Sequence, residues 1–79
     1  MIIRELHTVV LTRDLPEHGL EKGDVGAVVH RYEPELSYEV EFVTAEGKTL
    51  AVLTLTSEDV RLMSGDEILH ARGLVSLQG

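Results

Sequence analysis

The chain has 79 residues, no cysteine and a formal net charge of −7, from 14 acidic and 7 basic residues. This length suits one small domain, and the lack of cysteine excludes a disulfide framework and a thiolate metal site. The negative charge disfavours binding to nucleic-acid phosphates and anionic lipids. Because aromatic residues make up only 4% of the chain, the expected core consists mainly of valine and leucine.

The first predicted strand covers residues 7–13, where valine and leucine form a run of strand length. In the loop that follows, Leu20 is a lone apolar residue that we expect to tuck into the core. Gly23 offers a position where positive φ is easily adopted. We expect Asp24 to bond its own turn backbone, with a ligand-binding turn as the alternative. Gly26, early in the next strand, indicates a bulge or a close backbone approach.

The second predicted strand covers residues 25–32, and Pro34 then favours a turn because proline cannot donate to a ladder. Residues 37–44 alternate between apolar and polar side chains, so one face of this strand belongs to the core and the other to solvent. Gly47 is expected at the left-handed position of a hairpin turn. Residues 49–55 return as a fourth strand that is apolar on both faces, as in a central strand or a covered edge.

Residues 56–59 are typical of a single helical turn with a serine or threonine cap, and residues 60–62 of a short closing strand. The expected fold class is therefore all-β: a small five-stranded SH3-like barrel with a short 3-10 turn, formed by residues 1–63. The start of the chain is too short an apolar run for a signal peptide, and no segment has the ~20 apolar residues that span a bilayer. A cytoplasmic protein is expected.

Residues 64–79 form a C-terminal tail that we expect to pack on the barrel or on a partner chain. Ser64 and Glu67 match a capping box, which favours a short helix over residues 65–72. The same residues could instead form an added strand. Because the tail is apolar, it also predicts self-association of the protein as a homodimer.

Three sequence blocks carry a family resemblance: Pro-Glu-His-Gly-Leu at residues 16–20, Gly-Asp-Val-Gly at 23–26 and Tyr-Glu-Val-Glu-Phe-Val at 38–43. Together they resemble the bacterial domain-of-unknown-function family numbered 4926, over residues 5–62. The resemblance implies an SH3-like barrel in a short cytoplasmic protein and implies no catalytic residues. The Gly-Asp-Val-Gly block alone is similar to KOW-type barrels, which bind RNA or protein, and to the barrel of the nitrile hydratase beta subunit, which packs against a catalytic partner.

The titratable residues do not predict an enzyme. The four histidines lack the spacing of a helical metal site, so no metal and no cofactor is predicted. His18 is either a solvent-facing loop residue or a contact to a partner. Glu39 and Glu41 point the same way from one strand, but acid/base catalysis requires burial that separates the pKa values of two carboxylates. An acidic interaction patch is the better interpretation.

The favoured hypothesis is a non-enzymatic protein-interaction module that neutralises or supports a basic partner protein, such as a nuclease-type toxin. The possible partner-binding residues are His18, Glu39, Glu41, Ile68, Leu69 and Leu74. Two alternatives stay open. A KOW-like nucleic-acid-binding barrel would need the basic residues to gather on one face, against the total charge. An accessory barrel subunit of an enzyme would support the active site of another chain.

Overall fold

The computed structural model describes residues 3–34 and 36–74. Five strands form in chain order: β1 (Thr8–Leu11), β2 (Val25–Tyr32), β3 (Ser37–Val43), β4 (Thr49–Thr56) and β5 (Val60–Leu62). A short 3-10 turn, η1 (Pro16–His18), lies between β1 and β2. The predicted all-β class with five strands is confirmed, and β2 and β5 have the predicted bounds. No helix among the described residues is long and apolar enough to cross a membrane.

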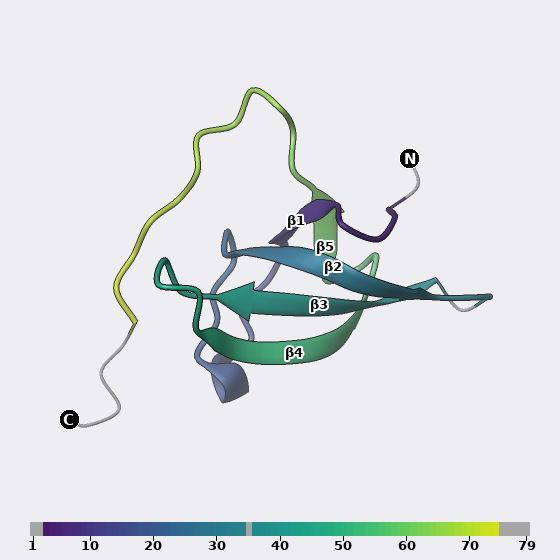
Figure 1. Cartoon of the computed structure of the whole chain (residues 1–79), viewed down its shortest axis with the longest axis horizontal. Helices are drawn as coiled ribbons and strands as arrows, with labels where there is room; N and C mark the ends of the chain where they lie inside the picture. Colours follow the sequence, from purple (N-terminus) through teal and green to yellow (C-terminus); the bar gives the residue numbers. More distant parts are fainter. Residues whose placement is uncertain (1–2, 35, 75–79) are drawn as a thin grey trace.

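The five strands form one antiparallel sheet in the order β4-β3-β2-β1-β5. The long strands β2, β3 and β4 run together across the view in Figure 1, and the short strands β1 and β5 lie at a steep angle to them. The sheet is curved like a small barrel (Figure 1). It is not closed, because β4 and β5 are the two ends of the strand order and do not pair with each other.

The core lies on the concave side of this sheet and is built from alternate residues of the strands. In β3, Tyr38, Val40 and Phe42 are buried, whereas the intervening Glu39 and Glu41 are only half-buried. The alternation predicted for this strand is therefore confirmed. Every strand contributes a side chain to the core cluster, which valine and leucine dominate.

The loop between β1 and β2 folds back on itself, as predicted. Leu15 and Leu20 form an isolated antiparallel bridge, and both side chains are buried. A Cβ atom on Gly26 would lie 2.7 Å from Cγ1 of Val40, so this glycine permits a close approach to β3. The alternative of a bulge at Gly26 is wrong, because the irregularity of β2 falls at Val29, between the paired residues Val28 and His30.

The turn between β4 and β5 is not the predicted helical turn. The Thr56 hydroxyl accepts the Glu58 N–H, and the Asp59 carboxylate accepts the Thr56 N–H at 2.9 Å. These side-chain bonds close a tight turn over residues 57–59 without helical geometry, because they satisfy backbone groups locally. The 3-10 turn of the protein lies instead at η1.

The tail is neither helix nor strand over residues 64–74, so both predicted conformations are wrong there, and residues 75–79 lie outside the described residues. It leaves β5, arches away and returns beside the β3–β4 hairpin (Figure 1). Half of the predicted capping box exists, since Ser64 N–H donates to Glu67 at 2.6 Å. However, both oxygens of Glu67 also bind Arg61 of β5, and so short a helix has little stability of its own.

Candidate functional site

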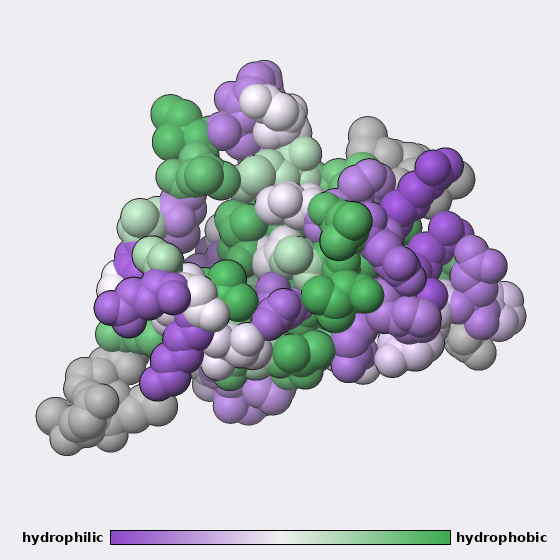
Figure 2. Space-filling model, in the orientation of Figure 1, coloured by the Kyte–Doolittle hydropathy of each residue, from purple (hydrophilic) through white to green (hydrophobic). Residues whose placement is uncertain are grey.

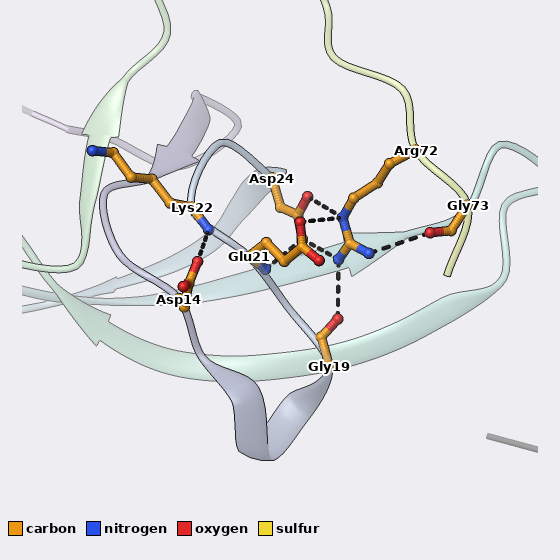
Figure 3. Close-up of polar contacts among 7 residues, drawn as sticks. All are labelled: Asp14, Gly19, Glu21, Lys22, Asp24, Arg72 and Gly73. Atoms are coloured by element: carbon orange, nitrogen blue, oxygen red, sulfur yellow. Dashed lines mark hydrogen bonds and ion pairs between the residues drawn. The ribbon is translucent and has the colours of Figure 1, made fainter. Parts of the chain in front are cut away.

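Arg72 fastens the tail to the loop between β1 and β2. Its Nη2 lies 2.6 Å from Oδ2 of Asp24 and its Nε lies 2.9 Å from Oδ1, while Nη2 also donates to the Gly19 carbonyl oxygen at 3.0 Å (Figure 3). The side chains of Arg72 and Asp24 are only 16% and 11% exposed. We call this pair the clasp. Paired N–H groups on one carboxylate are a strong arrangement, so the clasp fixes the path of the tail.

Asp24 holds the clasp and its own turn together. Its Oδ2 accepts the Glu21 N–H at 2.8 Å, which confirms the predicted bond to the turn backbone. Burial would raise the pKa of Asp24, but the hydrogen bonds from Arg72 and from the Glu21 backbone outweigh it and lower the pKa below the usual value. Asp24 is therefore charged at neutral pH and acts as a structural anion.

The tail and the end of the sheet enclose a groove of about 430 Å³. Leu20, Phe42 and Leu50 line its floor, and Leu69 and Leu74 line it from the tail. Two of the predicted partner-binding residues thus face their own domain in part. The tail covers apolar surface there, although Leu69 is still 70% exposed.

Four of the seven lysines and arginines are paired with carboxylates. Arg13 binds Asp59 at 2.7 Å, Arg31 lies 3.0 Å from Glu33, Arg61 binds Glu67 at 2.7 Å, and Arg72 binds Asp24. Of the lysines and arginines, only Arg4, Lys22 and Lys48 form no ion pair with a described residue. These four positive charges therefore serve contacts within the domain.

Glu39 and Glu41 are in a different situation on the convex side of β3. The Thr54 hydroxyl donates to Oε1 of Glu39 at 2.6 Å, and the Thr49 hydroxyl donates to Oε2 of Glu41 at 2.6 Å. Neither carboxylate is in an ion pair with a described residue. A carboxylate has about four acceptor positions, so the described residues fill only a part of the hydrogen-bonding capacity of each.

Three exposed valines surround these two carboxylates. Val52 lies directly opposite Glu41 on β4, Val29 is the bulged residue of β2, and Val43 ends β3. Each is between 44% and 50% exposed. We call these five residues the outer face, and Figure 2 shows apolar surface over β3 and β4 on the viewed side. Exposed apolar side chains beside polar groups are typical of an interaction surface.

The other candidates of the sequence analysis are not gathered into one site. His18 is exposed on η1, whereas Glu39 and Glu41 lie on β3. Ile68 is 93% exposed on the tail. No three metal-ligating side chains converge within residues 3–34 and 36–74. His7 accepts the Arg4 N–H at 2.9 Å, and the His30 ring packs edge-on against Tyr32.

Sequence reasoning missed the clasp and the composition of the outer face. Arg72 and Asp24 are 48 positions apart, and no local pattern indicates that they meet. The alternation of β3 did indicate the outward direction of Glu39 and Glu41. It did not indicate that Val29 would lie beside them, because that placement depends on the bulge in β2.

Residues 5–62 match the family described as "Domain of unknown function (DUF4926)", and the chain belongs to this family. The match spans all five strands and the loop with η1 but ends before the tail. No curated protein and no solved structure matches the chain.

Proposed function

We propose that this member of the family is a non-enzymatic, cytoplasmic protein-interaction module that binds a basic partner protein through the outer face. The observation that carries the proposal is the position of Glu39 and Glu41: two half-buried carboxylates that form no ion pair with a described residue and lie beside exposed valines. The residue opposite Glu39 on β2 is His30, not a lysine or arginine. Lysine or arginine of a partner would supply the missing cation, and the valines would supply apolar contact.

The charge balance supports a protein partner over a nucleic acid. The four arginines in ion pairs contribute little to phosphate binding, because carboxylates of the domain already neutralise them. The net charge of −7 also repels nucleic-acid phosphates. The same negative field would accelerate the encounter with a basic protein. Contact with this acidic module would neutralise the basic partner protein or support its structure.

The test starts from the full chain, tagged and purified from its own cells together with any retained protein. The retained protein is then produced separately, and its affinity for the wild type and for two double variants is measured by calorimetry. Glu39→Gln with Glu41→Gln removes the two charges of the outer face. Glu17→Gln with Glu46→Gln removes two charges from an exposed turn and hairpin and is the matched control.

We expect the outer-face variant to bind at least about tenfold more weakly and with a smaller salt dependence, and the control variant to stay within about twofold of the wild type. Retention of no partner would contradict the proposal, as would equal effects of the two variants. Retention of labelled RNA or DNA at low salt would favour the KOW-like alternative instead. Dependence of a partner enzyme's activity on this chain would favour the accessory-subunit alternative.

Self-association through the tail is a separate proposal. Ile68 and Leu69 are 93% and 70% exposed, and exposed apolar pairs of this kind favour contact with a second chain. Light scattering of the wild type and of the Ile68→Ser, Leu69→Ser variant gives the test. A dimeric wild type with a monomeric variant is expected, and a monomeric wild type would overturn the proposal.

A further inference from the structure

The edge strand β4 is open along one side. It pairs with β3 alone and has eight residues, Thr-Leu-Ala-Val-Leu-Thr-Leu-Thr, with no charged residue and no proline. The other edge, β5, is three residues long and contains Arg61. Proteins commonly protect edge strands by shortness, charge, proline or a bulge. The register of β4 is irregular at Leu50, but residues 51–56 pair regularly with β3 and contain no charge and no proline. Strand β4 is therefore the part of the sheet best suited to receive another strand.

The backbone groups that face the open side can be assigned. Thr56 N–H donates to the Asp59 side chain at 2.9 Å rather than to β3. Successive residues of a strand direct their N–H and C=O groups to opposite sides, so Thr54 and Val52 direct theirs to the open side. Leu53 and Leu55 direct theirs to β3, where they pair with Val40 and Tyr38.

The charge of the neighbouring surface determines which strand fits. Val52 and Thr54 lie opposite Glu41 and Glu39, so outward side chains of an added strand would lie one strand further from these carboxylates. Strands are about 4.8 Å apart, so the added strand would lie two spacings, about 9.6 Å, from β3. A long lysine or arginine side chain and a glutamate side chain that extend toward each other over β4 can span this distance. A second copy of this chain would instead bring another net charge of −7 to the same edge.

We propose that an extended segment of the basic partner adds to β4 as a sixth strand, with lysine or arginine at its outward positions and apolar residues at its inward positions. This inference rests on the proposed function and names its docking mode. The main-chain bonds to Val52 and Thr54 give affinity, and the alternate side chains give specificity. The inward apolar residues extend the core beside Leu53 and Leu55.

The probe is a seven-residue peptide that alternates valine and lysine, added to the full-length protein, with amide exchange measured by NMR. A peptide that alternates valine and glutamate is the control. We expect the valine–lysine peptide to slow exchange of the Val52 and Thr54 amides at least about tenfold and to leave Leu53 and Leu55 unchanged. The valine–glutamate peptide is expected to protect none of them.

Two variants sharpen this test. Thr54→Pro removes a donor on the open side and should abolish protection at Val52. Because proline could unfold the strand, Val52→Lys is compared with Val29→Lys: the two valines are 45% and 44% exposed and flank the same carboxylates, but only Val52 belongs to the edge. We expect Val52→Lys to weaken peptide binding several-fold more than Val29→Lys.

Peptide binding without protection of Val52 and Thr54 would overturn strand addition, and so would absence of peptide binding. Neither result bears on the proposed function, because the affinity of the co-purified partner for the Glu39→Gln, Glu41→Gln variant is measured without the peptide. If that affinity falls while the two amides keep exchanging in the complex, the outer face binds the partner and β4 does not receive a strand.

Discussion

Two groups of carboxylates in this small domain have the same charge and different neighbours. Asp24 and Asp59 each bind an arginine that is far away in the chain, and Glu67 binds Arg61 of the neighbouring strand β5. Among the residues that the structure describes, Glu39 and Glu41 are bound only by threonine hydroxyls of the adjacent strand. The first group holds the loop, the β4–β5 turn and the tail in place. The second group forms no ion pair with a described residue, which is why we propose that it binds a partner. The neighbours of an acid therefore distinguish the two groups, although the charge is the same.

The pKa values of the three carboxylates in the first group are all lowered. The pKa of Asp24 and of Asp59 is lowered although burial would raise it, and hydrogen bonds to Arg61 and to the Ser64 N–H lower that of Glu67 to about 2. A carboxylate whose pKa is lowered on folding stabilises the fold in its charged form. These acids are therefore part of the structure at neutral pH.

The largest effect on stability is expected at Leu20, the buried residue of the loop between β1 and β2 to which the clasp fastens the tail. Leu20→Ala should reduce the free energy of unfolding by about 2–4 kcal/mol, since it leaves a cavity beneath the loop. Val43→Ala on the outer face should cost less than about 1 kcal/mol because Val43 is half exposed. Urea denaturation measures both. Equal losses would mean that the loop is not anchored by Leu20.

A smaller effect is expected from the clasp itself. Asp24→Asn should cost about 1–2 kcal/mol, since it weakens the bonds to Arg72 and to the Glu21 N–H. Arg72→Ala should cost less, because the turn bond remains, and the two changes together should be less than additive. Urea denaturation and limited proteolysis of the tail give the measurement. Strict additivity would show that the pair is not coupled.

The clasp should also depend on pH. The pKa of Asp24 is lower in the folded state than the ordinary value near 3.9, so its contribution is fully present above that value. It is lost as the pH falls through the folded-state pKa. The stability difference between wild type and Asp24→Asn should therefore be constant from pH 7 to 5 and shrink below about pH 4. A difference that grows on acidification would contradict this assignment.

The smallest effect on stability is expected from the outer face. Glu39→Gln with Glu41→Gln should change the free energy of unfolding by less than about 0.5 kcal/mol, because the glutamine oxygen still accepts the threonine hydroxyl. Thermal or urea unfolding provides the check. A loss as large as that of Asp24→Asn would place these residues among the structural acids.

The sequence was sufficient where local pattern decides the structure. The alternation of β3 placed Glu39 and Glu41 on the outside, and the lone apolar Leu20 was correctly expected in the core. It was insufficient where side-chain pairs outside the local pattern determine the backbone conformation. The capping-box pattern at Ser64 favoured a helix, but Glu67 is held by Arg61, and the Arg72 clasp holds the tail extended against the loop. The partner of Arg72 lies 48 positions away in the chain, and such a tertiary pair has no signal in a single sequence.

The most direct test of the contrast between the two groups is the affinity of the co-purified partner for two variants measured side by side. We predict that Glu39→Gln with Glu41→Gln lowers this affinity at least about tenfold, and that Arg72→Ala, which breaks the clasp and leaves Glu39 and Glu41 unchanged, stays within about twofold of the wild type. Unchanged affinity of the outer-face variant, or an equal loss with Arg72→Ala, would contradict the account.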